Sequence, residues 1–401
     1  MKLWNFYCRV YQNVFRVAVM FLDWKPPQLL TGAGSVKKLP DLVKRSGVKK
    51  LLVVTDPGLM KLGLLNGLLE GLTQAGLSYV VYSDTQANPT IDNVEAARKL
   101  YADNGCQAII AFGGGSPMDC AKAAGARIAK PKQPMQKMRG VLKILKKLPP
   151  FYAVPTTAGT GSECTIVAVV TDAKTHEKYA VTDPVLRPRV AVLDPALTTG
   201  LPPHITSTTG MDALTHAVEA YIGRSNTKST VDYAEKATKI IFQSLEQAYT
   251  DGANILAREQ MLLASHYAGL AFTRAYVGYV HAIAHNLGGH YNVPHGLANA
   301  VILPYVLEFY GASAHKRLAQ LFAQTGLTAK ADTDAAKAEA FIAEIRAMNR
   351  RMGIPEKFDM IQEKDIPTIA QRALKEGNPM YPVPKIMDQA RCEALIRQMM
   401  A

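Results

Sequence analysis

The sequence predicts an α/β domain followed by an all-α domain. Between residues 27 and 200, short apolar strands alternate with helical segments, which is the pattern of a parallel sheet covered by helices. After the sequence Leu201-Pro202-Pro203, Ala- and Leu-rich helical periodicity dominates to the C-terminus. A chain of 401 residues has enough material for two such domains. We therefore place a domain boundary near residue 200 and treat residues 1–26 as a separate N-terminal extension.

The first domain is built from apolar runs that alternate with longer periodic segments. Strands are expected at residues 50–55, 78–82 and 108–112, and helices at residues 64–75, 91–104 and 116–129. A β-rich portion follows around residues 165–171, 178–181 and 189–193. The region 201–401 lacks such strand patterns and is expected to be helical.

The net charge of +13 suggests a protein that binds nucleic acid or an anionic membrane. Much of that excess lies in residues 127–147, which carry eight basic residues and no acidic one. No aromatic residue is interleaved there to stack on bases, so we expect a solvated surface segment and no nucleic-acid partner. The five cysteines are scattered and form no Cys-x-x-Cys motif, which favours a reducing cytoplasm.

The N-terminal extension, residues 1–26, is rich in aromatic and basic residues. Its longest uninterrupted apolar run, residues 17–22, is too short to span a bilayer. We expect an amphipathic helix that covers the body of the protein or a partner subunit. Peripheral membrane contact through residues 1–25 is the alternative.

A glycine-rich turn follows the strand expected at residues 108–112. Gly113, Gly114 and Gly115 precede Ser116 and Pro117, which suit a helix start, and Asp119 completes a pattern like a capping box. Bare backbone N–H groups at the start of a helix can bind phosphate. The Gly-x-Gly-x-x-Gly fingerprint is missing, so an ordinary Rossmann domain is not predicted, and a tight turn without a ligand is the alternative.

Two further features point to a dinucleotide. Residues 155–163 form a second loop of small hydroxyl and glycine residues, which could wrap a diphosphate or a ribose; a plain flexible connection is the alternative. Asp56 comes directly after the strand expected at residues 50–55. Its carboxylate could accept hydrogen bonds from the ribose hydroxyls of NAD and would repel the 2′-phosphate of NADP, whereas an N-cap or turn is the alternative.

Histidines and one carboxylate suggest a metal centre in the helical region. Asp212 and His216 are spaced i, i+4, as are His281 and His285, so each pair would share a helix face. We expect Gly288 and Gly289 to interrupt the second pattern and the sequence Pro294-His295-Gly296 to form a turn. A carboxylate and three imidazoles suit Fe(II), Zn(II), Ni(II) or Mn(II). Hydrogen-bonded core histidines are the alternative reading.

Taken together, these motifs resemble the iron-containing, group III alcohol dehydrogenase family. The resemblance is carried by the glycine turn, by the loop from Pro155 to Glu163, by the stretch from Gly210 to Ala217, and by His281, His285 and Pro294-His-Gly296. It implies an N-terminal NAD-binding α/β domain, a C-terminal helical domain that binds the metal, and a site in the cleft between them.

The resemblance also assigns roles by position. It implies metal ligands at Asp212, His216, His281 and His295, and His285 beside them as a group that positions substrate or relays a proton. Fe(II) is the expected metal and Zn(II) the alternative. The implied cofactor contacts share the glycine turn, the second loop and their surroundings: Asp56, Asn88, Gly114, Gly115, Ser116, Asp119, Thr156, Thr157, Thr160 and Lys178.

The expected activity is reversible hydride transfer between NAD and a short-chain primary alcohol or aldehyde. Phe272 is expected to wall the substrate pocket, and Val167 is apolar where diol-binding members of the family carry an amide. The alternatives are a lactaldehyde or propanediol oxidoreductase, a non-redox lyase like dehydroquinate synthase, and a binding or scaffold role. We further expect a small-molecule substrate and a homodimer.

Overall fold

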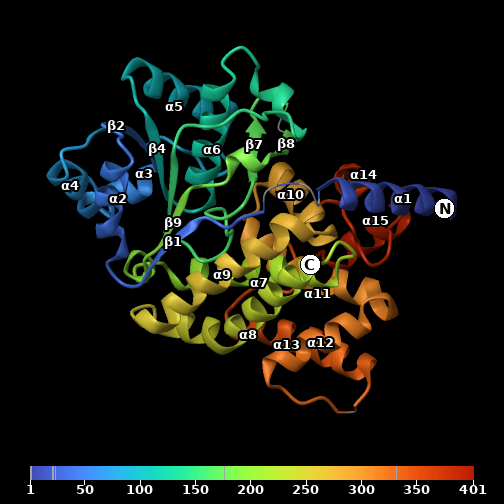
Figure 1. Ribbon diagram of the computed structural model, residues 1–401. Helices are drawn as coiled ribbons and strands as arrows, with labels where there is room; N and C mark the ends of the chain where they lie inside the picture. Colours follow the sequence, from blue (N-terminus) through green and yellow to red (C-terminus); the bar gives the residue numbers. More distant parts are fainter. Residues whose placement is uncertain (1, 20–21, 23, 176, 331) are drawn as a thin grey trace. The chain divides into compact units, whose positions relative to one another are not determined.

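A computed structural model of the protein describes residues 2–19, 22, 24–175, 177–330 and 332–401 (Figure 1). The chain divides into two compact units. We call Asp23–Gly200 together with Ala253–Leu262 the α/β unit, and Met1–Leu22, Leu201–Gly252 and Leu263–Ala401 together the helical unit. Residues 1, 20, 21 and 23 of the predicted N-terminal extension lie outside the described residues.

A six-stranded parallel sheet forms the centre of the α/β unit, with the strand order β1-β9-β6-β4-β2-β3 (Figure 1). Its strands are β1 (Gln28–Thr31), β2 (Lys50–Val54), β3 (Ser78–Tyr82), β4 (Ala108–Gly113), β6 (Phe151–Pro155) and β9 (Val190–Leu193). The chain passes from β2 to β3 on one side and then returns to β4 on the other side of β2. In such sheets, ligands bind outside the carboxyl ends of the strands where the winding reverses.

A smaller sheet accounts for most of the β-rich portion that was expected after residue 165. It has the order β5-β8-β7, with β5 (Gly140–Val141), β7 (Val167–Asp172) and β8 (Glu177–Thr182). Strands β7 and β8 pair antiparallel, so that Val167 lies opposite Thr182.

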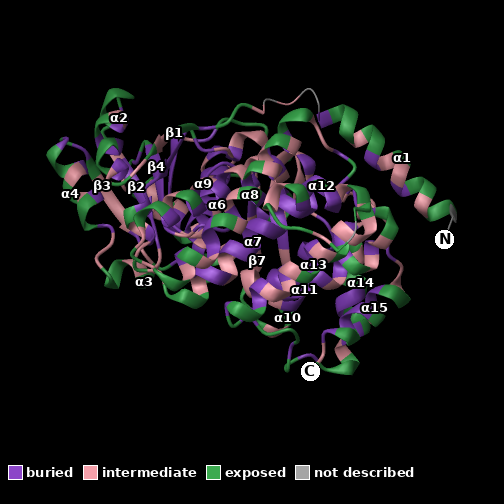
Figure 2. Ribbon diagram, turned by 90° about the horizontal axis from the view of Figure 1, so that it is seen from below, coloured by how far each residue is buried: buried purple, intermediate pink, exposed green. Residues whose placement is uncertain are grey.

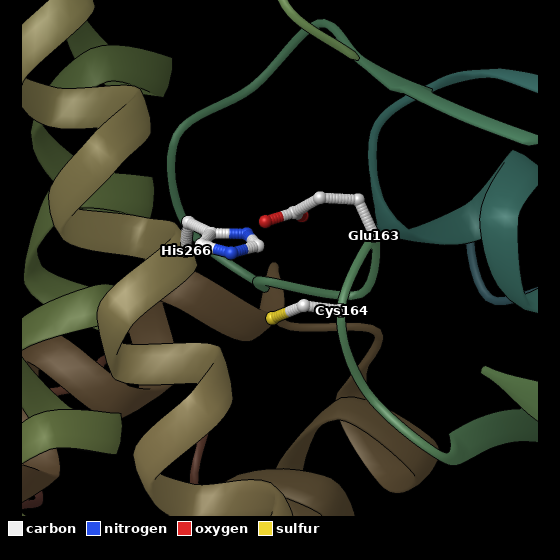
Figure 3. A group of neighbouring side chains, drawn as sticks. All are labelled: Glu163, Cys164 and His266. Carbon is white, nitrogen blue, oxygen red and sulfur yellow. The ribbon is translucent and has the colours of Figure 1, made fainter. Parts of the chain in front are cut away.

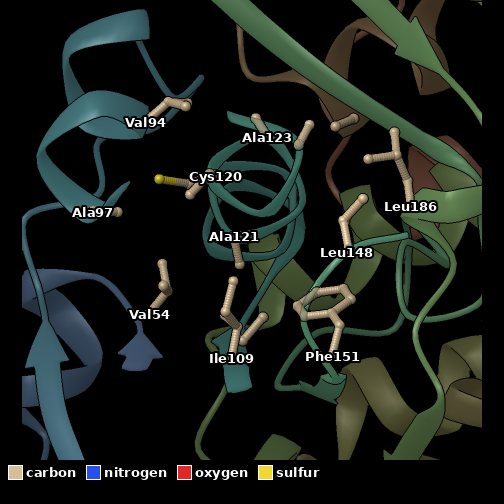
Figure 4. Close-up of a cluster of buried hydrophobic side chains, with 14 of the residues drawn as sticks. Val54, Val94, Ala97, Ile109, Cys120, Ala121, Ala123, Leu148, Phe151 and Leu186 are labelled. Carbon is tan, nitrogen blue, oxygen red and sulfur yellow. The ribbon is translucent and has the colours of Figure 1, made fainter. Parts of the chain in front are cut away.

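Helices cover both faces of the large sheet because its strands are apolar on both sides. On β2, Leu52 and Val54 belong to the cluster that contains side chains of α5 and α6 (Figure 4), whereas Leu51 and Val53 pack with α2 and α4. The helices of this unit are α2 (Leu39–Arg45), α3 (Pro57–Lys61), α4 (Asn66–Gln74), α5 (Ile91–Asp103) and α6 (Gly115–Ala129). The predicted α/β class is confirmed.

The second unit is helical, as predicted. Its helices are α1 (Lys2–Val19), α7 (Pro203–Ile222), α8 (Lys228–Thr250), α9 (Ile255–Ala275, grouped with the α/β unit as far as Leu262), α10 (Tyr279–Tyr291), α11 (His295–Tyr310), α12 (His315–Thr325), α13 (Asp334–Arg351), α14 (Ile366–Gly377) and α15 (Gln389–Gln398).

Two local expectations in this unit are wrong. Gly288 and Gly289 do not end a helix, because α10 continues through both to Tyr291 and ends at Asn292 in the left-handed conformation. His295 does not lie in a turn but is the first residue of α11, after Pro294 as N-cap. The start of α11 therefore fixes the position of His295.

The N-terminal helix α1 has one buried and one exposed face. Cys8, Gln12 and Val19 are buried, while a stripe on the opposite side is exposed (Figure 2). The exposed apolar residues of α1 are Leu3, Trp4, Phe6, Tyr7, Val10, Val14 and Val17. None of the described helices is long and apolar enough to cross a membrane.

The basic segment 127–147 is less uniformly solvated than expected. Arg127 is buried at the end of α6, where it forms an ion pair with Glu95 and donates to the carbonyl oxygens of Lys130 and Pro131. Part of the positive charge therefore stabilises the local fold.

Candidate active site

Four predicted ligand residues meet inside the helical unit. Asp212 and His216 lie one turn apart on α7, His281 lies in the first turn of α10, and His295 begins α11. Asp212 Oδ1 is 3.9 Å from His216 Nδ1, 3.7 Å from His281 Nε2 and 3.6 Å from His295 Nε2. The structure thus brings together residues that are up to 83 positions apart (295 − 212) in the sequence.

These distances fit the coordination shell of one divalent cation. Metal–ligand bonds of about 2.1 Å in a tetrahedron separate the ligand atoms by roughly 3.4 Å. One ligand atom each from Asp212, His216 and His281 lies within 4.8 Å of the other two, and all three residues are buried. His295 is the most exposed of the four, with its side chain 25% accessible. A cation here would have protein ligands on the buried side and an accessible ligand at His295.

Asn299, which the sequence analysis did not identify, donates a hydrogen bond into the centre of the four ligands. Its Nδ2 lies 2.6 Å from Asp212 Oδ1, 3.1 Å from His281 Nε2 and 3.2 Å from His295 Nε2. One carboxylate oxygen and two imidazole nitrogens from three helices therefore converge on one amide nitrogen. The same three atoms would converge on a cation with the histidine rings neutral, which supports the fit of the ligand set.

Glu219 contacts the Nδ1 atom of His281, which is the ring nitrogen that does not face Asp212. Its carboxylate lies 2.6 Å from His281 Nδ1 and accepts hydrogen bonds of 2.8 Å from the backbone N–H groups of Gly278 and Val280. A bond of this kind at Nδ1 fixes the ring so that Nε2 faces the metal site. A Cβ at Gly278 would lie 2.7 Å from Glu219 Oε1, so a side chain there would displace the carboxylate.

Electrostatics explain why this buried cluster suits a cation. Burial alone would raise the pKa of Asp212, but His216, His295 and His281 outweigh it and hold the pKa of Asp212 far below its usual value. Burial also lowers the pKa of His281, yet Asp212 and Glu219 raise the pKa of His281 to about 9. The site is therefore a region of negative potential that stabilises positive charge.

His285 and Phe272 flank the ligand cluster. The His285 ring stacks on His295 with centroids 5.1 Å apart, and its Nδ1 lies 2.7 Å from Glu376 Oε1 on α14. Phe272 on α9 stacks on His216 with centroids 4.2 Å apart. Both residues therefore lie directly beside ligand candidates, and their contact with a substrate stays a prediction.

In the α/β unit, the glycine turn and the second loop lie against each other at the carboxyl end of β4. Gly114 is the N-cap of α6, and the Thr156 N–H donates to the Gly113 carbonyl oxygen. A Cβ at Gly114 would lie 3.3 Å from Thr157 Oγ1, and a Cβ at Gly115 would lie 2.8 Å from Thr160 Cγ2. The backbone at the start of α6 is thus bare, with threonines beside it, as a phosphate site requires.

Three further predicted cofactor residues are linked by hydrogen bonds. The Asn88 N–H donates to Ser116 Oγ over 3.3 Å, and Lys178 Nζ on β8 donates to Asn88 Oδ1 over 2.8 Å. Asn88 has φ 58°, a left-handed conformation that asparagine tolerates better than most residues. This places one cationic and two polar side chains at the start of α6, the region expected to bind the cofactor.

Asp119 and Lys122 lie one turn apart on α6 and form hydrogen bonds with the end of the second loop and with the residues that follow it. Asp119 accepts hydrogen bonds from Ser162 Oγ and from the Val169 N–H. Lys122, which the sequence analysis missed, is fully buried and donates to Ser162 Oγ, to both oxygens of Thr165 and to the Val167 carbonyl oxygen. The carboxylate of Asp119 is thus engaged by the loop, and its direct contact with a cofactor stays a prediction.

The end of the second loop is held by hydrogen bonds within the α/β unit. Figure 3 shows Glu163 at the end of this loop and Cys164 directly after it, and it also draws His266, which lies on the part of α9 that belongs to the helical unit. Glu163 and Cys164 are buried, and Cys164 Sγ donates to the Gly161 carbonyl oxygen over 3.1 Å. The end of the loop is therefore buried and hydrogen-bonded, and its contact with a cofactor stays a prediction.

Asp56 follows β2, the neighbour of β4 at the position where the winding of the sheet reverses. Its side chain caps α3 by accepting a hydrogen bond of 3.0 Å from the Leu59 N–H. Capping uses Oδ1 and leaves the second carboxylate oxygen for another donor. The N-cap reading holds, and a ribose contact is compatible with it.

Some of the residues missed in the sequence had a local signal and others had none. Glu219 continues the Asp212 and His216 face at i, i+7, and Asn299 is i+4 from His295. Glu376 is 91 residues from His285, and only the packing of α14 against α10 brings them together. Val167 begins β7 in the α/β unit, and its predicted substrate contact stays untested.

Comparisons with known proteins agree with this geometry. A family model described as "Iron-containing alcohol dehydrogenase" matches residues 26–195, and one described as "Fe-containing alcohol dehydrogenase family, C-terminal" matches residues 206–400. Similar curated proteins include alcohol dehydrogenase 4 of Saccharomyces cerevisiae, 37% identical over 88% of this chain and 91% of the relative. Another is the 1,3-propanediol dehydrogenase of Citrobacter freundii, 39% identical over 86% of this chain and 90% of the relative.

Solved structures give the same result. A 1,3-propanediol oxidoreductase superposes with a TM-score of 0.90 at 36% identity, covering 94% of this chain and 100% of its own. An alcohol dehydrogenase from Oenococcus oeni superposes with a TM-score of 0.90 at 34% identity, covering 94% of this chain and 99% of its own. The two family models together span nearly the whole chain after residue 25. The chain belongs to the iron-containing alcohol dehydrogenase family.

Proposed function

We propose that this protein is a metal-dependent, NAD-linked alcohol dehydrogenase that interconverts short primary alcohols and aldehydes. The observation that carries the proposal is the convergence of Asp212, His216, His281 and His295 within the helical unit of a chain from this family. The relatives named as alcohol, propanediol and lactaldehyde enzymes support alcohol oxidoreduction as the reaction class.

Asp212, His216, His281 and His295 would hold the cation, which we propose is Fe(II), with Zn(II) as the alternative. When bound, the cation supplies Lewis-acid polarisation of the alcohol oxygen, and NAD supplies the hydride acceptor. The protein contributes orientation: Glu219 fixes the His281 ring, and Phe272 fixes the His216 ring by stacking. The oxygen-and-nitrogen donor set, without thiolate, suits either metal.

NAD is the proposed cofactor of the α/β unit. The bare N–H groups at the start of α6 would bind the diphosphate, with Thr156, Thr157 and Thr160 on the facing loop. Asp56 favours NAD over NADP because its charge would repel a 2′-phosphate. Lys178 and Asn88 form a polar pair at the same helix start.

His285 is the proposed proton carrier. Its imidazole would take the hydroxyl proton of the alcohol and release it to water, as a positioned general base does. Glu376 binds Nδ1 over 2.7 Å, so Nε2 is the atom left to receive that proton.

The substrate class follows from the walls of the site. Phe272 gives an apolar surface beside His216, which suits the short alkyl chain of a primary alcohol. Val167 brings no polar group for a second hydroxyl. A diol remains compatible, because 1,3-propanediol dehydrogenases are among the similar proteins.

The test is formation of NADH by purified protein reloaded with Fe(II) or Zn(II). We expect turnover with ethanol, propanol or butanol and weaker turnover with 1,3-propanediol, with NAD preferred over NADP. His281→Ala should abolish activity, whereas His204→Ala, an exposed histidine at the start of α7, should not. Absence of turnover on every alcohol and aldehyde in the panel, together with binding of a phosphorylated sugar acid, would favour the lyase alternative.

We further propose that the protein acts in the cytoplasm as a homodimer and touches anionic membranes through α1. All five cysteines are free and buried, which suits a reducing compartment. The first 22 residues contain Lys2, Arg9 and Arg16 and no acidic residue, and the outward face of α1 is apolar. Sedimentation with phosphatidylglycerol vesicles but not with phosphatidylcholine vesicles, lost in Val10→Asn/Val14→Asn, would support this contact; equal sedimentation with both would contradict it.

A further inference from the structure

Helix α1 precedes the part of the chain that the family models match, which begins at residue 26. Its buried face nevertheless packs against the segment that joins α14 to α15. Figure 1 shows α1 alongside these two helices in the helical unit. The contacts of α1 with this segment therefore belong to this chain rather than to the matched family core.

Two polar side chains of α1 bind backbone carbonyl oxygens of the joining segment. Gln12 Nε2 donates to the carbonyl oxygens of Pro379 (3.1 Å) and Tyr381 (2.8 Å). Arg9 donates to those of Val383 (2.7 Å) and Pro384 (2.9 Å), and also to Gln12 Oε1 over 2.9 Å. Residues between α14 and α15 form no helix or strand, so their carbonyl groups need partners outside regular structure.

The same segment supports the active site. The Tyr381 hydroxyl donates to Glu376 Oε1 over 3.0 Å, and Glu376 Oε1 lies 2.7 Å from His285 Nδ1. His285 stacks on the ligand residue His295. A continuous chain of contacts thus runs from the α1 side chain of Gln12 through Tyr381 and Glu376 to the proposed proton carrier.

A second contact of α1 involves the short segment between α9 and α10. Phe15 packs on Tyr276 with ring centroids 5.8 Å apart. Tyr276 has φ 67°, a left-handed conformation that is costly for an aromatic residue and needs support from its surroundings. Two residues later, the Gly278 N–H donates to Glu219, the carboxylate that orients His281. Helix α1 therefore packs on two segments. The segment after α14 contacts Glu376, and the segment before α10 contacts Glu219.

We propose that α1 is a positioning element of the active site, acting through Gln12 and Arg9 on Tyr381, Glu376 and His285. The proposal rests on the alcohol dehydrogenase function stated above. Gln12 and Arg9 are positioning residues because they touch neither substrate nor cofactor in this chain of contacts. Loss of their hydrogen bonds would let the Tyr381 segment move, and the His285 ring would lose its fixed orientation.

The first test is Gln12→Met in the full-length, metal-loaded protein. Methionine keeps the length of the side chain and removes both donors. We expect kcat with a primary alcohol to fall roughly 3- to 10-fold, because small displacements of reacting groups are costly. The KM for NAD should not change, since the cofactor residues lie in the other unit. Asn13→Ala, an exposed position next to Gln12, is the matched control and should behave like the wild type.

A double-mutant cycle separates positioning from general destabilisation. If Gln12 acts through Tyr381, Gln12→Met should have little further effect on kcat in a Tyr381→Phe background. Independent effects would multiply instead, and multiplication of the two losses would overturn the proposal. An unchanged kcat in Gln12→Met would overturn it as well. Arg9→Met repeats the test if Gln12→Met does not fold.

A readout that does not need activity keeps this proposal distinct from the proposed function. Amide hydrogen exchange in residues 377–384 should accelerate in Gln12→Met and stay at the wild-type rate in Asn13→Ala. If exchange is faster in Gln12→Met but the wild-type protein turns over no alcohol, the contact of α1 with this segment is supported and the dehydrogenase assignment is refuted. If exchange is unchanged in Gln12→Met, the positioning role of α1 is refuted whatever the activity.

Discussion

The carboxylate of Glu219 accepts from two backbone N–H groups and contacts the Nδ1 atom of His281. The sequence alone identified His281, because histidines spaced i, i+4 near a glycine stand out as ligand candidates. It did not identify Glu219, because a glutamate in a helix is most often a solvated residue. What distinguishes Glu219 is burial, with its side chain only 1% exposed, and burial comes from packing of α7 with distant segments.

Glu219→Gln should weaken metal binding. Glutamine keeps the shape but replaces one acceptor oxygen with an NH2 group, which would face a backbone N–H. Loss of an orienting partner of this kind typically lowers metal affinity about 10- to 100-fold. Competition with a chromophoric chelator for Zn(II) measures the change. Glu246→Gln, at an exposed ion pair with Arg351, serves as the control, and an equal affinity in Glu219→Gln and the wild type would contradict the prediction.

Asp56 combines two roles that a pair of substitutions can separate. Asp56→Asn keeps a side-chain oxygen for the cap of α3 and removes the charge, so we expect lower KM for NADP and an unchanged melting temperature. Asp56→Ala should also improve NADP use but lose about 1 kcal/mol of stability with the cap. Steady-state kinetics with both cofactors and thermal denaturation measure the two effects. A strict NAD preference in Asp56→Asn would show that another residue selects the cofactor.

At the scale of elements, the strands were the most predictable part of the fold. Apolar runs such as residues 50–55 and 108–112 match β2 and β4 almost residue for residue. Strands that are buried on both faces are apolar at nearly every position, so the apolar run begins and ends with the strand. The start of α11 was not predictable. Pro294 and Gly296 suggested a turn, yet Pro294 caps a helix, and a Cβ at Gly296 would lie 2.5 Å from the Thr208 carbonyl oxygen of α7. The close approach of two helices explains that glycine.

The contact between α6 and the second loop depends on Lys122, and Lys122→Met should weaken cofactor binding. Methionine would leave Ser162 Oγ and the carbonyl oxygens of Thr165 and Val167 without this donor. Each buried unsatisfied group costs ~1–3 kcal/mol, so the loop should shift and the KM for NAD should rise severalfold. Isothermal titration with NAD measures the affinity. Lys99→Met, an exposed lysine of α5, is the control, and equal NAD affinity in Lys122→Met would contradict the prediction.

Lys122 also predicts a pH dependence of stability. Burial lowers the pKa of Lys122 to about 8, below its usual value of 10.5. Between these values the unfolded chain binds this proton more tightly than the folded chain, so the contribution of Lys122 to the free energy of unfolding increases as pH rises from 8. The cost of burying the charge is fully present below pH 8. The free energy of unfolding, measured by urea denaturation at pH 7.5 and 9, should increase more with pH in the wild type than in Lys122→Met. An equal increase in both proteins would contradict the assignment.

At the scale of the whole molecule, each unit carries the residues proposed for one half of the chemistry. The four proposed metal ligands belong to the helical unit, and the glycine turn with its facing loop belongs to the α/β unit. The sequence predicted this division of roles, because motifs are local and each lay within one compositional region. It could not predict Glu376 or the contacts of α1, because these depend on which helices pack together within the helical unit. Long-range packing, rather than residue type, decides those contacts.

The separate location of the two sites predicts separate effects of the two ligands on unfolding. Zn(II) at 100 times its dissociation constant should stabilise the folded protein by about 2.7 kcal/mol, and NAD at the same ratio by the same amount. For units of this size, that corresponds to a rise of roughly 5–10 °C in melting temperature, measurable by differential scanning calorimetry. Asp212→Ala should remove the Zn(II) shift and keep the NAD shift, whereas Gly115→Val should do the reverse, because a side chain at position 115 would meet Thr160. Each variant is the control for the other, and loss of both shifts in either one would mean that the two ligands do not bind where the residues place them.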